Sequence, residues 1–390
     1  MPIKDKLFSL FFCLYLFWYS IACIILGSND ASVDSSSMRI IMVSIFFLSL
    51  GFYFSYKRRN EIVVWGILTC FALLFYATQF FYPLKGFTYE GQFLRWGSEC
   101  TAACLMGITL MKLKNYTVIH KILPLIIICA TIFFVPETIK NASSESLMHL
   151  DSGMNYQTMA YTLAVLFAMS LYYVFINKEF SHAIIRLILI LCMPIQAVTC
   201  CMAGGRGGVV LLVVYIFALS FVMLKLRLIT KFRLFVLVCF GIVLFVVTSN
   251  YLNLWSSTGF ARSSGLIHDD DRIELWQSIW IFVENNSYMG YGLGGDYYTF
   301  GFYTHNILLD FILELGIFGM FIMLFLFYKI YRVIFKNILT DSIFVLLLIV
   351  SLYGLVLNMF SGYWITTYSH WMALGVALTY PHSVKQKTRN

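Results

Sequence analysis

Long apolar runs separated by short polar segments make up most of this sequence. Of its 390 residues, 60% are hydrophobic and only 12% are charged, and the mean hydropathy is +0.82. Soluble domains carry about 25% charged residues, whereas about 20 consecutive apolar residues cross a bilayer as a helix. The sequence therefore predicts an all-α integral membrane protein. We count twelve apolar segments, at roughly 7–27, 38–56, 61–82, 91–111, 118–136, 155–176, 184–203, 208–224, 232–250, 306–328, 341–360 and 363–379.

The distribution of Lys and Arg predicts the orientation of these segments. If they alternate across the membrane, 20 of the 27 Lys and Arg residues lie on one side and 7 on the other. Cytoplasmic connections carry the excess of basic residues, so both termini are expected in the cytoplasm. The net charge of +8 then reflects topology and gives no reason to expect a nucleic-acid partner. We interpret residues 1–390 as one polytopic membrane domain that contacts membrane lipids.

The longest polar segment, residues 251–305, is expected to be a large external loop within that domain. After its acidic triplet, Asp269–Asp271, the sequence from Asp271 to Glu274 has the pattern of a helix capping box. Apolar residues at three- and four-residue spacing up to Val283 then predict a short amphipathic helix. The triplet could instead bind a divalent metal, but capping and solvent exposure account for it, so we expect no metal and no cofactor.

Two arginines on the external side are predicted to begin helices. Arg206 lies in the glycine-rich turn 204–208, directly before an apolar segment, and Arg272 is the first residue of the expected loop helix. Helix N-termini attract anions, and a guanidinium fork matches phosphate oxygens. These positions favour phosphate binding, although an arginine at a membrane interface can also extend its charge into the headgroups without a specific ligand.

His305 ends the loop and precedes the tenth apolar segment. An imidazole titrates near neutral pH, which suits a general base, and Asp310 and Glu314 share one helix face with Asn306 and could orient it. The competing interpretation is a hydrogen-bonded residue at the membrane interface. A second polar pair, Arg95 and Glu99, is four residues apart and is expected to form an ion pair, either structural or functional.

Taken together, these motifs resemble the O-antigen ligase and polymerase superfamily of bacterial inner membranes. The resemblance covers about residues 200–320 in its motifs, and the whole chain in length and expected topology. The motifs are Arg206 in a turn that opens a span, Arg272 followed by Trp276, Gly290-Tyr291-Gly292, His305-Asn306-x-x-Leu309 and Glu314-x-Gly316-x-x-Gly319. The turn around Arg206 is Gly-rich, where the family usually has Ser and Thr.

The resemblance implies a metal-independent glycosyltransferase of the bacterial inner membrane. Its donor would be a glycan on undecaprenyl pyrophosphate, and its acceptor a sugar of lipid A–core for an O-antigen ligase. A repeat-unit polymerase, whose acceptor is a second lipid-linked repeat unit, is the alternative. By position, Arg206 and Arg272 would bind the pyrophosphate and His305 would deprotonate the acceptor. A twelve-span transporter or flippase is disfavoured, because transporters concentrate polar groups near the bilayer midplane, often in repeated halves.

Overall fold

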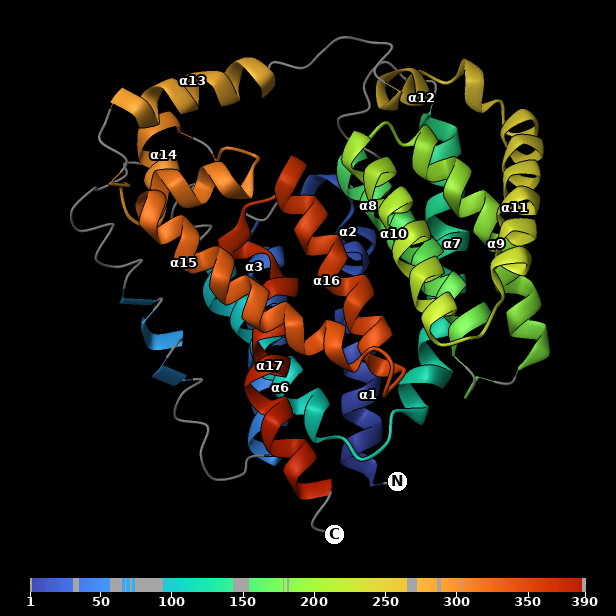
Figure 1. Cartoon of the computed structure of the whole chain (residues 1–390), viewed down its shortest axis with the longest axis horizontal. Helices are drawn as coiled ribbons and strands as arrows, with labels where there is room; N and C mark the ends of the chain where they lie inside the picture. The colour runs from blue at the N-terminus through green and yellow to red at the C-terminus, as the bar shows by residue number, and fades with distance from the viewer. Residues whose placement is uncertain are drawn as a thin grey trace. The chain divides into compact units, whose positions relative to one another are not determined.

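The structure is a computed structural model. It describes residues 2–30, 35–56, 65–66, 68–70, 72–73, 94–142, 154–177, 179–180, 182–264, 272–285, 289–301 and 303–387. Every regular element in these ranges is helical, which confirms the expected all-α class (Figure 1). The chain divides into two compact units. The first comprises Met1–Met38, Lys114–His268 and Lys336–Val356, and the second comprises Arg39–Leu113, Asp269–Phe335 and Leu357–Asn390.

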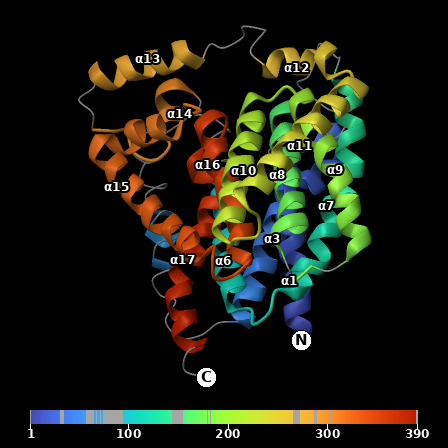
Figure 2. The ribbon, with the colours of Figure 1, turned by 45° about the vertical axis from the view of Figure 1, so that its right-hand side comes forward.

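The first unit is a helical bundle with α8 at its centre, because α8 packs on α7, α9 and α10 (Figure 2). Gly205 and Gly208 allow the start of α10 to approach Ala160 of α8 closely. The helices are α1 (Ile3–Tyr15), α2 (Trp18–Asp30), α7 (Thr117–Asn141), α8 (Tyr156–Leu171) with the π-helix η2 (Tyr172–Ile176), α9 (Ala183–Met202), α10 (Arg206–Lys225), α11 (Lys231–Tyr251), η3 (Leu254–Ser256), α12 (Thr258–Ser263) and most of α16 (Ile343–Phe360).

In the second unit, α17 packs along α6. Gly107 and Gly375 lie in this contact, where an added Cβ would collide with the backbone of the opposite helix. Small residues permit such close helix pairs in membranes. The helices are η1 (Trp96–Cys100), α6 (Thr101–Lys112), α13 (Arg272–Asn285), α14 (Gly295–Phe300), η4 (Trp364–Thr366), α17 (Tyr368–Lys387) and most of α3 (Ser36–Ser55) and α15 (Ile307–Asn337).

Eight helices in the described ranges are long and apolar enough to cross a membrane. A ninth candidate is the pair α1 and α2, which is bent by 70°. Each of these nine corresponds to one of the twelve segments expected from the sequence. The eight are α3, α7, α8 with η2, α9, α10, α11, α15 and α16.

The other three expected segments show why the count of twelve is not confirmed. Most of 61–82 lies outside the described residues. Segment 91–111 contains a π turn at which Arg95 Nε pairs with Glu99 Oε2 at 3.3 Å, and the following α6 is almost wholly buried. Segment 363–379 begins with the short 3₁₀ helix η4 before α17 starts. Some apolar segments of the sequence therefore form helices that are long and apolar enough to cross a membrane, whereas others form buried helices that are not.

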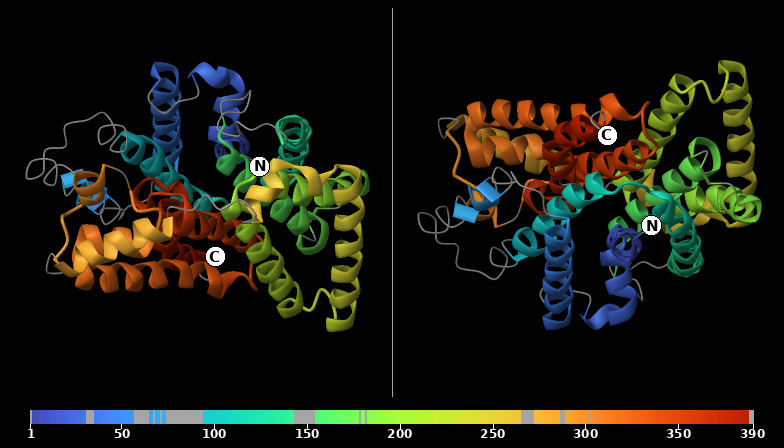
Figure 3. Two further views of the ribbon diagram at one scale, coloured as in Figure 1. Left: turned by 90° about the horizontal axis from the view of Figure 1, so that it is seen from above. Right: turned by 90° about the horizontal axis from the view of Figure 1, so that it is seen from below.

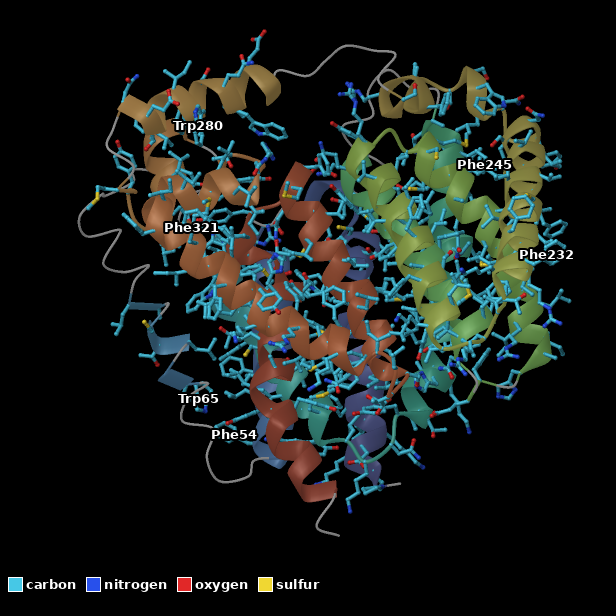
Figure 4. All side chains as sticks on the ribbon, in the orientation of Figure 1. Phe54, Trp65, Phe232, Phe245, Trp280 and Phe321 are labelled. Carbon is cyan, nitrogen blue, oxygen red and sulfur yellow. The ribbon has the colours of Figure 1, made fainter. Side chains whose placement is uncertain are left out.

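α11 has the surface expected of a helix in contact with lipid. Ser249 is its one buried residue, and Phe232 is 75% exposed. Figure 3 shows α11 at the rim of the first unit, and Figure 4 shows Phe232 on its outer side. A helix that is apolar all round is either buried or in a membrane, and α11 is not buried.

Candidate active site

The turn before α15 is held by hydrogen bonds to Thr304 and Asn306. Thr304 donates its backbone N–H, at 3.1 Å, and its hydroxyl, at 2.6 Å, to Oδ1 of Asp310. The carbonyl of Thr304 accepts the indole N–H of Trp276 at 3.0 Å. Asn306 Oδ1 accepts the backbone N–H of Leu308 at 3.0 Å and so caps α15. The residues on either side of His305 are thus both anchored.

His305 itself adopts a left-handed backbone conformation, with φ of +59°. Such a conformation costs a non-glycine residue about 1–3 kcal/mol and persists where the surrounding structure imposes it. The imidazole is half-buried and lies edge-on to Tyr303, with the ring centroids 4.4 Å apart. The hydroxyl of Tyr303 is bound in turn to the carbonyl of Ser361 at 3.0 Å. The turn therefore presents the His305 side chain in a defined direction.

α13 brings Arg272 into the neighbourhood of this turn. The helix begins at Arg272, as the sequence predicts, and buries Ile279 and Val283 against Ile312 and Leu313 of α15. Figures 1 and 2 both show α13 beside α14 and the start of α15. Trp276, whose indole binds Thr304, lies one helical turn, about 6 Å, beyond Arg272. The positive end of the α13 dipole is therefore close to the His305 turn.

The glycine-rich segment 290–295 docks onto a break in α15. Gly316 has φ of +71° and ψ of 178°, which interrupts the helix. The interruption leaves the carbonyls of Leu313 and Glu314 without helical partners, and they accept the backbone N–H groups of Tyr291 and Gly292, each at 2.7 Å. Three glycines of the segment have positive φ, from 78° to 83°, which side chains rarely tolerate. The segment thus forms a turn whose conformation depends on its glycines.

Glu314 connects the glycine-rich turn at 290–295 to the segment before α17 through hydrogen bonds. Its buried carboxylate accepts the backbone N–H of Gly294 and the indole N–H of Trp364, each at 2.9 Å, and the hydroxyl of Tyr363. A carboxylate that accepts several donors is stabilised where it lies. Glu314 therefore has a structural role in the second unit and is poorly placed to serve as the base.

Arg206 starts α10 in the first unit and is held in a different way. Gly204 has φ of +83°, and Gly205 is the N-cap without any side-chain capping bond. Arg206 is half-buried, and its Nε donates to the carbonyl of Arg262 at 3.1 Å. The guanidinium of Arg262 lies over the ring of Tyr156, 5.1 Å from its centroid. Arg206 and Arg262, both of which the sequence assigns to the external side, are therefore in contact.

Some of the site residues expected from the sequence lie in the same unit, and others lie apart or outside the described residues. His305 and the start of the Arg272 helix lie together in the second unit, whereas Arg206 belongs to the first. The triplet Asp269–Asp271 lies outside the described residues. Within the described part of the chain, no group of three or more His, Cys, Asp or Glu residues is arranged to hold a metal ion.

Sequence reasoning did not predict the contacts that hold the His305 turn. The bond of Thr304 to Asp310 has no local pattern that marks it, and Trp276 was noted only as part of the family motif and not as the donor to the carbonyl of Thr304.

Residues 188–324 match the family model described as O-antigen ligase. This segment contains Arg206, Arg272 and His305, and the match confirms over its length the resemblance inferred from the motifs. Among curated proteins and solved structures, none matches the chain. The family match and the eight apolar helices together indicate a multi-pass membrane protein that acts on lipid-linked glycans.

Proposed function

We propose that this chain is an O-antigen ligase. It transfers a glycan from undecaprenyl pyrophosphate to a sugar hydroxyl of lipid A–core on the periplasmic side of the bacterial inner membrane. The observation that carries the proposal is the His305 turn. A half-buried imidazole is held in a left-handed conformation between two anchored residues, inside the segment that matches the O-antigen ligase family.

In the proposed reaction, His305 accepts the proton of the acceptor hydroxyl. The hydroxyl oxygen forms a bond to the anomeric carbon of the donor, and the bond from that carbon to the diphosphate oxygen breaks. The diphosphate leaves with the electron pair, and Arg206 and Arg272 stabilise its growing negative charge. Direct displacement of this kind inverts the anomeric centre. The arginines supply the positive charge, so the reaction needs no metal ion.

Acceptor transfer by purified protein tests this function. The protein is reconstituted with an undecaprenyl-pyrophosphate-linked glycan and offered lipid A–core, a second lipid-linked repeat unit, or both. We expect extension of lipid A–core, unchanged by EDTA. Extension of the repeat unit alone would show a polymerase, and export of the donor without transfer would show a transporter. Loss of activity in EDTA with recovery in Mg²⁺ would overturn metal independence and assign a role to Asp269–Asp271.

The proposed site requires residues 251–305 to face the periplasm and both termini to face the cytoplasm. The uneven distribution of Lys and Arg supports this topology. Single cysteines at Ser264 and Ser383, in a variant without the ten native cysteines, report it by labelling with an impermeant reagent. We expect labelling of the Ser264 position alone from outside the membrane, and the reverse pattern would contradict the topology.

A further inference from the structure

Asp310 is the second buried carboxylate of α15, and its partners differ from those of Glu314. It is 0% exposed, and its Oδ1 accepts two hydrogen bonds from one residue, Thr304. One comes from the backbone N–H at 3.1 Å and the other from the hydroxyl at 2.6 Å. Since the carbonyl of Thr304 is also held by Trp276, both the backbone and the side chain of Thr304 are fixed.

We propose that Asp310 is a positioning residue for His305 and acts through Thr304, an inference that rests on the proposed function. His305 follows Thr304 directly and keeps a strained φ of +59°. A left-handed conformation of a non-glycine residue persists only where the surrounding structure imposes it. The two bonds to Asp310 help to impose it, and without them His305 relaxes to an ordinary conformation and its imidazole turns away.

The second oxygen of Asp310 supports a role beyond packing. Asp310 Oδ2 is buried and has no hydrogen-bond partner among the described residues. A buried polar atom without a partner costs stability. Holding Thr304 requires only one acceptor oxygen, which an amide would supply as well. A buried ionisable residue in a membrane helix is a candidate for a functional role, and the bonds of Asp310 to Thr304, next to the residue proposed as the base, point to positioning as that role.

Glu314 provides a matched comparison on the same helix. It lies one turn further along and is equally buried, at 1% exposed. Its hydrogen bonds go to Gly294, Tyr363, Trp364 and Asp296, and none of these partners is Thr304. A substitution of Glu314 therefore reports the cost of disturbing a buried carboxylate of α15 without releasing the His305 turn directly.

A double-mutant cycle tests the inference in the full-length protein. In the wild-type background, Asp310→Ala is expected to lower kcat by about 10²-fold, the effect of a displacement near 1 Å, with KM for the donor changed less than about twofold. In the His305→Ala background it is expected to change the residual rate by less than about twofold. Equal losses in the two backgrounds would overturn the inference.

Two further variants keep the test decisive. Asp310→Asn retains an acceptor oxygen for Thr304 and is expected to recover most of kcat; a loss as large as in Asp310→Ala would show that Thr304 is not the link. Thr304→Val removes the hydroxyl, and with it the bond to Asp310 and the contacts of the same oxygen with the backbone N–H and carbonyl of Asn306. The backbone N–H of Thr304 still binds Asp310, so this variant replaces Asp310→Ala in the cycle if that variant does not fold. It is expected to lower kcat about tenfold in the wild-type background only, and equal losses in both backgrounds would overturn the inference.

Glu314→Gln is the control and is expected to lower thermal stability and to affect both backgrounds alike. Full transfer by His305→Ala alone would instead refute the proposed role of His305 as the base, on which the inference rests, whatever Asp310 does.

Discussion

The starts of α10, at Arg206, and of α15, just after His305, are held in place by different kinds of contact. α10 begins at Arg206 without a side-chain cap, and its first turn is placed by glycines that let its backbone touch Ala160. The turn before α15 contains no glycine between Tyr303 and Ile307 and is placed by hydrogen bonds of Thr304 and Asn306. Close backbone packing thus positions Arg206, whereas a network of hydrogen bonds positions His305, the residue proposed as the base.

This difference tells which substitutions each region tolerates. A packed contact between backbones has no room for an added methyl group, and interiors of that density respond to a single methylene. A hydrogen-bonded turn accepts changes of volume more readily but fails when a donor or acceptor is removed. Four substitutions test the contrast, beginning with the one that should reduce transfer most.

His305→Ala is expected to slow transfer by about 10²–10⁴-fold, the usual effect of removing a general base. Binding of the lipid-linked donor should be nearly unchanged, because the arginines remain. The wild-type rate should fall at acidic pH, since a protonated imidazole cannot accept a proton, and the variant should lack this fall. Single-turnover transfer and donor binding in nanodiscs measure both effects. Lost donor binding with a retained pH profile would make His305 a binding residue.

Arg206→Lys and Arg272→Lys are each expected to reduce transfer on the order of tenfold. Lysine keeps the positive charge but lacks the planar guanidinium that binds two phosphate oxygens at once. The loss of transfer rate should therefore be smaller than the roughly 10²–10³-fold loss that follows complete removal of a stabilising donor. Arg233→Lys, at an exposed position in the first turn of α11, is the matched control. Near-normal rates for both variants would show that neither arginine binds the donor through its fork.

Gly208→Ala is expected to destabilise the first unit by about 1–3 kcal/mol, the cost of overpacking. The new methyl group would lie 2.5 Å from Cβ of Ala160 and 2.7 Å from its carbonyl carbon. Gly241→Ala in α11 is the control, because nothing lies within 4 Å of its added Cβ. Thermal unfolding in detergent should separate the two variants, and equal stability would mean that the contact with Ala160 is not tight.

Much of the fold followed from local sequence pattern. The apolar runs located nine of the candidate spans, counting the bent pair α1 and α2 once, and the three- and four-residue spacing located α13 with Arg272 at its start. These features depend on residues within a few turns of one another, so composition and periodicity are sufficient to reveal them. The ion pair of Arg95 and Glu99 is of the same kind.

The helical class, the apolar helices and the positions of Arg206, Arg272 and His305 at or near helix starts were thus predictable from the sequence. Three features emerged only with folding: Glu314 binds the glycine-rich turn, Asp310 binds Thr304, and His305 adopts a left-handed conformation. Glu314 reaches Trp364 across 50 residues, and Tyr303 reaches Ser361 across 58. A hydrogen bond has no periodicity along the chain, and a buried polar group finds its partner wherever folding places one.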